Sequence, residues 1–104
     1  MKKSSTNGRY YKIGVTALAA GASVSFDVGS LVACFFDTGP NTVAPGIEAQ
    51  FDDCNPAFQI RIGMYLRFHF PVTRVTFKNN TGGPLDFSMV WSGNPNFYIL
   101  QGNV

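Results

Sequence analysis

The chain has 104 residues, of which 13% are charged, and its formal net charge is +2. A chain of this length forms one domain, and folding should bury roughly 65% of the surface of the unfolded chain, enough for a core without metals or disulfides. The small net charge gives no reason to expect nucleic acid as a partner. No apolar run reaches the about 18 residues that a membrane-spanning helix needs, so we expect no membrane partner.

Aromatic side chains are abundant for so few charges. Ten Phe, four Tyr and one Trp make up 14% of the chain. Each ring buries about 150–250 Å² of surface when it is packed. A small two-layer domain cannot place all of these rings on its inner face, so we expect some of them to lie between molecules. The composition therefore favours self-association.

The N-terminus divides into a polar part and a first strand. Residues 2–8 hold no apolar side chain, which predicts a flexible arm at 1–8 and a β-domain at 9–104. From Tyr11 to Ala17, apolar side chains alternate with polar or small ones, as in a strand. A signal peptide is the alternative, and the short, interrupted apolar stretch disfavours it.

The same alternation continues along most of the chain and predicts half-buried antiparallel strands. Clusters of Gly, Pro, Asn and Asp separate the strands, and no window shows convincing helical periodicity. The predicted strands are 9–18, 23–28, 31–36, 46–51, 57–62, 64–70, 72–79, 85–92 and 97–100. Short strands with close turns are typical of an all-β, antiparallel β-sandwich, jelly-roll-like, with almost no helix.

Two connections carry specific turn signals. Gly29-Ser30 is all that separates the strands 23–28 and 31–36, which predicts a two-residue hairpin. The polar run 79–84 predicts a turn before the strand 85–92. Its first residues, Asn79-Asn80-Thr81, also match the N-glycosylation pattern, but a hairpin turn explains them fully.

The segment 37–56 is the least regular part of the chain, and loops of this kind carry specificity on a rigid scaffold. Two cysteines, Cys34 and Cys54, lie at its borders. A disulfide between them would imply an oxidising compartment, whereas two free thiols are the interpretation that we favour. Their spacing fits neither a metal site nor a CxxC redox pair.

Residues with catalytic or metal-binding chemistry are few. His69 is the sole histidine and has no nucleophile or carboxylate beside it in sequence, so we expect it to face water or a neighbouring subunit. Asp52, Asp53 and Asn55 supply three oxygen-bearing side chains without EF-hand spacing, so a turn is the expected structure. We therefore predict no enzyme, no cofactor and no metal.

Exposed aromatic rings offer a different kind of site. Tyr10, Tyr11, Tyr98 and Trp91 together suggest a sugar-stacking platform. Trp91, however, is in phase with the apolar positions of the strand 85–92, which indicates a core residue. Tyr10 and Tyr11 point to opposite faces of a strand, so at most one of them can join such a platform.

The order of the turn motifs provides one further clue. The first strand ends in a turn of the form L-x-A-G-x-S at 18–23. Phe70-Pro71 precedes the hairpin 75–85, whose sequence runs Val-Thr-Phe-Lys-Asn-Asn-Thr-Gly-Gly-Pro-Leu, and 90–93 reads Val-Trp-Ser-Gly. This order resembles that of the small all-β virion structural proteins of tailed bacteriophages, although the segment 37–56 fits it poorly.

The resemblance implies a virion component made in the host bacterial cytoplasm. It implies a capsid decoration (cement) protein, a spike or a tail part, commonly a symmetric homo-oligomer and often a homotrimer. Its partners would be further copies of itself and the major capsid protein or another virion protein. A cement protein stabilises the shell by burying apolar surface, at about 25 cal/mol per Å² before the cost of association. The candidate interface residues are Tyr10, Tyr65, Arg67, His69 and Tyr98.

A receptor- or carbohydrate-binding module of a spike or tail is the alternative. It would use the loop 37–56 and exposed aromatic rings such as Tyr98. Binding to a glycan array that is lost on Tyr98→Ala would favour it over the decoration protein.

Overall fold

The computed structural model describes residues 10–38, 46–53, 55–61 and 63–94, with the backbone alone for residues 37 and 38. The described residues form six strands and no helix. The strands are β1 (Tyr11–Leu18), β2 (Ser23–Thr38), β3 (Ile47–Phe51), β4 (Phe58–Ile60), β5 (Tyr65–Asn79) and β6 (Leu85–Ser92). They form one antiparallel sheet in the order β1-β6-β2-β5-β3-β4.

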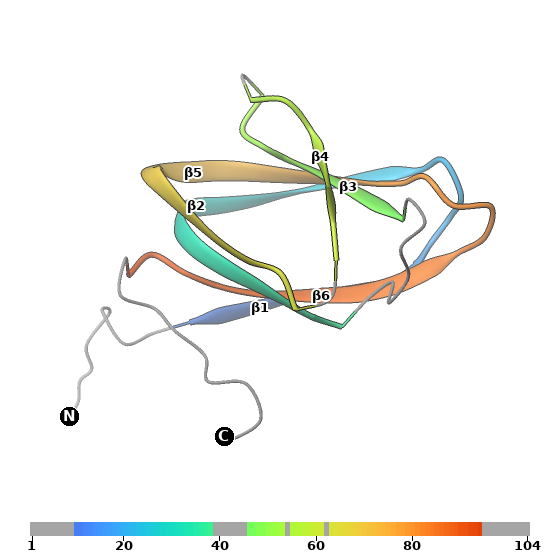
Figure 1. Ribbon diagram of the computed structural model, residues 1–104, viewed down its shortest axis with the longest axis horizontal. Helices are drawn as coiled ribbons and strands as arrows, with labels where there is room; N and C mark the ends of the chain where they lie inside the picture. The colour runs from blue at the N-terminus through green and yellow to red at the C-terminus, as the bar shows by residue number, and fades with distance from the viewer. Residues whose placement is uncertain (1–9, 39–45, 54, 62, 95–104) are drawn as a thin grey trace.

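Two long strands, β2 and β5, give this sheet its shape. The first half of β2 pairs with the second half of β5, which also pairs with β3. The second half of β2 lies between the start of β5 and β6, which in turn pairs with β1. Figure 1 shows both long strands bending at one side of the molecule and passing from one layer to the other. The sheet is thus curled into a half-barrel, with its two halves facing each other.

The bend in β2 corrects the prediction of a hairpin at Gly29-Ser30. Gly29 has φ of +74°, and the register with β5 shifts between Asp27 and Leu31, yet β2 runs on in the same direction. A bulge of this kind bends and twists a strand without reversing it. The predicted strands 23–28 and 31–36 are therefore two halves of one strand.

The predicted strands 64–70 and 72–79 also belong to one strand. Pro71 lies inside β5, where the register with β2 shifts between Arg67 and Val72, and both Phe70 and Pro71 are exposed to solvent. Proline lacks the N–H that a ladder requires, and it is tolerated in a sheet at edges and bulges. Pro71 thus marks the bend and does not end the strand.

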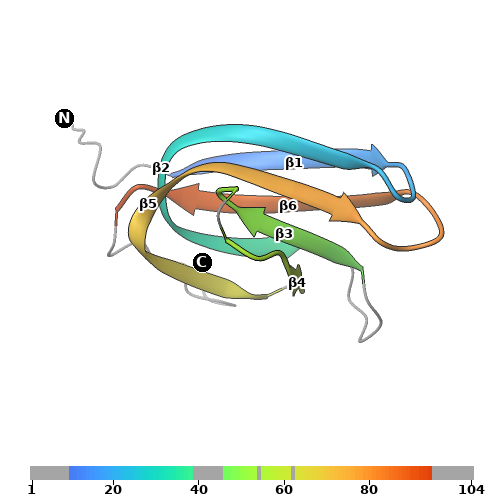
Figure 2. The same cartoon turned by 90° about the horizontal axis from the view of Figure 1, so that it is seen from above.

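The all-β, antiparallel fold class is confirmed. The finer expectation of a jelly-roll-like sandwich is not confirmed, since the described strands form one curled sheet (Figure 2). The predicted strand 85–92 agrees with β6, and 9–18, 46–51 and 57–62 contain β1, β3 and β4. The arm 1–8 and the predicted strand 97–100 lie outside the described residues.

The core lies inside the curl and is rich in aromatic rings. Phe77 is fully buried, and its ring centroid lies 4.8 Å from that of Phe87, 6.2 Å from Phe26 and 6.3 Å from Phe36. These rings come from β2, β5 and β6, so they join the two halves of the sheet. Trp91 is partly buried against the same core cluster, as its phase in β6 predicted.

Cys34 is a free thiol in this core and has no accessible surface. The prediction of a free thiol is therefore confirmed for Cys34, whereas Cys54 lies outside the described residues. Burial raises the pKa of the Cys34 thiol to about 12, because the thiolate would lose its hydration. Cys34 is therefore a packing residue that stays protonated at neutral pH.

The turn between β5 and β6 is organised by a buried side chain. Asn79 Nδ2 donates hydrogen bonds to the carbonyl oxygens of Leu18 (2.7 Å) and Gly83 (2.8 Å). Asn79 Oδ1 accepts hydrogen bonds from the backbone N–H (2.8 Å) and the hydroxyl (2.7 Å) of Thr81. The polar run 79–84 turns the chain as expected, but the prediction of a hairpin is wrong, because β6 pairs with β1 and β2 and not with β5. Since Asn79 has no accessible surface, its amide is closed to a glycosylating enzyme in the folded chain.

Candidate functional site

Three of the predicted interface residues lie on one strand. Tyr65, Arg67 and His69 occupy alternate positions of β5, on the face that points away from the core. The Arg67 guanidinium carbon lies 5.7 Å from the centroid of the Tyr65 ring, a cation–π distance. Arg67 and His69 are exposed. This part of β5 therefore presents cationic and polar groups on the surface.

The Tyr65 side chain is less exposed than we expected for an interface residue. It packs against a small outer cluster formed by Ala33 and Val90, and its ring centroid lies 6.0 Å from that of Phe35. Ala33 and Phe35 belong to β2 and Val90 to β6, so Tyr65 helps to cover neighbouring strands. Its first role in the fold is packing.

Of the two remaining candidates, Tyr10 does not join this group. Tyr10, which is 62% exposed, precedes β1, and β6 and β2 separate β1 from β5. Tyr98 lies outside the described residues. Tyr11, which is 45% exposed, packs against Trp91 with 4.7 Å between the ring centroids. Among the described residues, the exposed rings of this candidate platform are Tyr10 and Tyr11, and Trp91 is partly buried as the sequence indicated.

The most exposed large apolar side chain described is one that the sequence did not single out. Phe70 is 80% exposed, and Phe58 is 37% exposed. The alternation in β5 put Phe70 on the inner face with Leu66 and Phe68, but the bend at Pro71 carries it away from the core. The Phe70-Pro71 dipeptide was the one available signal for this exposure.

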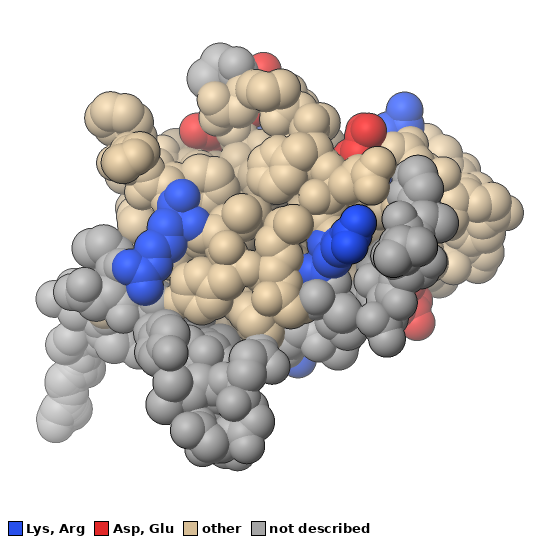
Figure 3. Space-filling view, in the orientation of Figure 1, with Lys and Arg blue, Asp and Glu red and all other residues tan. Residues whose placement is uncertain are grey.

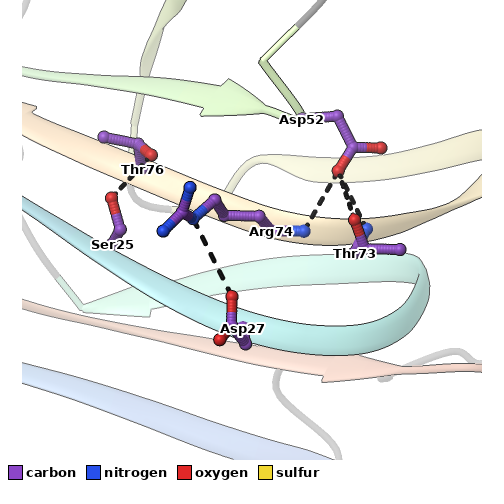
Figure 4. Close-up of polar contacts among 6 residues, drawn as sticks. All are labelled: Ser25, Asp27, Asp52, Thr73, Arg74 and Thr76. Atoms are coloured by element: carbon purple, nitrogen blue, oxygen red, sulfur yellow. Dashed lines mark hydrogen bonds and ion pairs between the residues drawn. The ribbon is translucent and has the colours of Figure 1, made fainter.

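A polar hollow of about 490 Å³ opens where β3 ends beside β5. It is lined by Asp27, Asp52, Asp53, Thr73 and Arg74. Asp52 Oδ1 accepts hydrogen bonds from Thr73 N (2.9 Å), Thr73 Oγ1 (3.0 Å) and Arg74 N (3.0 Å), as Figure 4 shows. Arg74 Nε lies 3.8 Å from Asp27 Oδ1, and both side chains are well exposed, so this ion pair contributes little to stability.

The Asp52 carboxylate serves as a clip between β3 and β5. Its residue has φ of +65°, which turns the chain at the end of β3 and aims the carboxylate at β5. The hydrogen bond from the Thr73 backbone, with those from Arg74 N and the Thr73 hydroxyl, holds the pKa of Asp52 below its ordinary value of 3.8. The carboxylate is thus committed to the backbone and is a weak proton acceptor.

Replacing Asp52 by alanine should lower the free energy of unfolding by about 1–3 kcal/mol. The variant loses the three hydrogen bonds of the carboxylate, and it places an alanine at a positive φ. Urea unfolding followed by Trp91 fluorescence measures the change. Asp53→Ala is the matched control, because Asp53 is exposed and lines the same hollow. An equal effect of the two substitutions would contradict the clip.

The stabilising effect of Asp52 should also depend on pH in one direction. Because its pKa is lower in the folded chain, the clip contributes fully above the ordinary value of 3.8. The contribution is lost as the pH falls through the folded pKa. The difference in stability between the wild type and Asp52→Ala should therefore shrink in acid, and unfolding curves between neutral pH and pH about 2 measure it.

The oxygen cluster of Asp52, Asp53 and Asn55 is held in a turn. Asn55 Nδ2 donates to the Phe51 carbonyl oxygen, and Gln50 Nε2 donates to the Asn55 carbonyl oxygen at 2.8 Å. In the described ranges, no group of three or more His, Cys, Asp or Glu side chains is placed to hold a metal ion. The side chains of Asp52 and Asn55 thus bond to the chain itself, whereas Asp53 is exposed.

Charge is scattered over the face that Figure 3 shows. Lys and Arg side chains appear there at separate places, with uncharged surface between them. Within residues 10–38, 46–53, 55–61 and 63–94, no helix has the length and apolar character needed to cross a bilayer.

Comparisons with protein-family models, curated proteins and solved structures find no match to this chain. Its function is therefore inferred from its own surfaces.

Proposed function

We propose that this protein is a non-enzymatic structural protein of a bacteriophage virion, a capsid decoration (cement) protein that assembles as a symmetric oligomer. The observation that carries the proposal is Phe70, whose ring is 80% exposed where β5 bends and its register with β2 shifts. Burying such a ring in an interface contributes about 1.5–3 kcal/mol. The resemblance in turn order supplies the virion context.

Other exposed groups add to this contact surface. Tyr10, Tyr11 and Phe58 are large apolar residues with more than a third of their surface exposed. Aromatic rings and arginine are the residues that most often dominate the energy of an interface, and Arg67 is exposed on β5. A decoration protein needs such anchors twice, for its own oligomer and for the shell. These exposed side chains fit a protein whose surface is buried in interfaces with other proteins.

Replacing Phe70 by serine should weaken assembly at least ten-fold, because the variant loses about 1.5–3 kcal/mol of ring burial. Size exclusion with light scattering measures the oligomer, and co-sedimentation with undecorated shells measures docking. Thr16→Ser, an exposed change on β1, is the control and should alter neither. Removal of residues 1–8 tests separately whether the arm contributes.

A wild-type chain that stays monomeric and ignores undecorated shells would overturn the proposal. The homotrimer expected from the resemblance is one specific outcome of the mass measurement. Loss of shell binding with the oligomer intact would place Phe70 at the shell contact instead of the subunit contact.

The polar hollow favours a second candidate, a receptor- or carbohydrate-binding module. Asp53, Asp27 and Arg74 present carboxylates and a guanidinium in one depression, and these groups hydrogen-bond to sugar hydroxyls. Asp52 belongs to the loop expected to carry specificity. A monomeric chain that is retained on an immobilised glycan, and released by the free sugar, would support this candidate over the decoration protein.

A further inference from the structure

The edges of an open sheet expose backbone N–H and C=O groups that can pair with another chain, and proteins usually carry features that prevent this pairing. In the described residues, β1 and β4 are the outer strands of the sheet order. The curl adds a third edge, the first half of β2 at 23–28, which pairs with β5 on one side and with no described strand on the other.

The edges at β1 and β4 have features that disfavour pairing with another chain. β1 contains Lys12, and Ala17 has φ of +54°, with its N–H bonded to Asp86 Oδ1 at 2.7 Å. This irregularity breaks the row of backbone groups that a second strand would need. β4 has three residues and is too short to template a ladder.

The edge at 23–28 has fewer of these features, and Asp27 is its one charged residue. It holds no Lys, Arg or Pro, and its backbone is regular up to Gly29. Ser23, Ser25 and Asp27 alternate with Val24 and Phe26, so the strand has a polar outer face and an apolar inner face. Figure 2 shows this part of β2 along one side of the molecule.

The ladder with β5 determines which backbone groups point outward. Asn79 N donates to the Ala22 carbonyl oxygen at 3.0 Å, and Asn79 O accepts from Gly21 N at 2.8 Å, so both backbone polar groups of Asn79 point toward β2. Hydrogen-bonded and non-hydrogen-bonded pairs alternate in an antiparallel ladder, and the register holds without a shift through residue 27. The N–H and C=O groups of Ser23, Ser25 and Asp27 therefore point away from β5.

We propose that the first half of β2 pairs antiparallel with the same segment of a second copy of this chain, about a two-fold axis at Ser25. Ser25 then lies opposite Ser25 of the second copy, and Ser23 lies opposite Asp27. All three outward-pointing residues enter the shared ladder. The two curled sheets become one continuous sheet across the axis.

The side chains select this register over its neighbours. The Asp27 carboxylate faces a serine hydroxyl, and the half-buried Val24 and Phe26 face each other beside the core. An axis at Asp27 would set two carboxylates face to face. An axis at Ser23 would bring Gly21, at φ of +76°, into the ladder. The register at Ser25 avoids both.

A cysteine cross-link tests the pairing directly. In a Cys54→Ser background, Ser25→Cys should form an intermolecular disulfide under mild oxidation, because residues in a hydrogen-bonded pair have Cα atoms about 5.5 Å apart. Cys34 stays unreactive, since it is buried. Ser23→Cys is the matched control, because its two copies would lie about 13 Å apart. Equal cross-linking of the two variants would overturn the register.

The second measurement compares the dissociation constants of two lysine variants and needs no cross-link. Ser25→Lys opposes two ammonium groups at the axis and should raise the dissociation constant of the dimer about five-fold at low salt. Ser23→Lys would face Asp27 and should leave the dissociation constant unchanged or lower it. Both positions are exposed, so the fold should tolerate both changes. The reverse order of effects would contradict the two-fold at Ser25.

This inference rests on the proposed function in one respect, that both require self-association, and their failures can be told apart. A trimer by light scattering without a Ser25→Cys cross-link would remove the β2 contact and leave the decoration role standing. A cross-linked dimer that ignores undecorated shells would remove the decoration role and leave the β2 contact standing.

Discussion

Replacing Phe77 by alanine should lower the free energy of unfolding by about 3–5 kcal/mol. Phe77 is fully buried in β5, and its ring contacts those of Phe26, Phe36 and Phe87. The variant loses the transfer free energy of the ring and leaves a cavity between strands that belong to both halves of the sheet. Urea unfolding followed by Trp91 fluorescence measures the loss, which is a large share of the stability of a domain of this size.

The control for Phe77 lies on the same strand. Phe70→Ala removes the same ring from a position that is 80% exposed, so it should change the stability of the monomer by less than about 0.5 kcal/mol. Should Phe77→Ala fail to fold, Phe77→Leu keeps most of the volume and should lose less. A loss below about 1 kcal/mol for Phe77→Ala would contradict its place at the centre of the core.

Replacing Asn79 by alanine should lower the free energy of unfolding by about 2–4 kcal/mol. The Asn79 side chain makes hydrogen bonds to Leu18, Thr81 and Gly83, and it has no accessible surface. Its removal leaves the carbonyl oxygen of Leu18 buried without its side-chain donor and loosens the turn into β6. Thermal and urea unfolding of the purified variant measure the effect.

Asn80→Ala is the matched control for Asn79→Ala. Asn80 is the next residue and is exposed, and its backbone N–H, which the substitution retains, donates to the Gly46 carbonyl oxygen at 2.9 Å. It should therefore change stability by less than about 0.5 kcal/mol. Similar losses for the two variants would mean that the buried hydrogen bonds of Asn79 do not hold the turn.

The sequence predicted the strands better than their connections. Alternation placed Val24, Phe26 and the strand 85–92 correctly, because a strand imposes a period of two on every half-buried segment. Gly29 was assigned to a hairpin, since hairpins and bulges both use a glycine with positive φ. Pairing of the second half of β2 with β6 decides between them, and those residues lie far away in the sequence.

The candidate contact residues show the same limit. Arg67 and His69 are exposed as expected, whereas Tyr65 is partly covered by Ala33 and Val90, which come from other strands. Phe70 has the right phase for the core and is exposed because the strand bends at the next residue. Alternation describes a straight strand, so it fails where bulges redirect side chains.

The pairing of β1 with β6 has a consequence for synthesis on the ribosome. In the described part of the chain, β6 is the sole ladder partner of β1, with Tyr11 opposite Trp91. Chains emerge N-terminus first at about 5–20 residues per second, so β1 waits about 4–16 s for its partner. A nascent chain that stops before residue 85 cannot complete the sheet, and it leaves Val15 and Leu18 of β1 without the strand that covers them. The sheet order thus makes translation through β6 a condition for pairing β1.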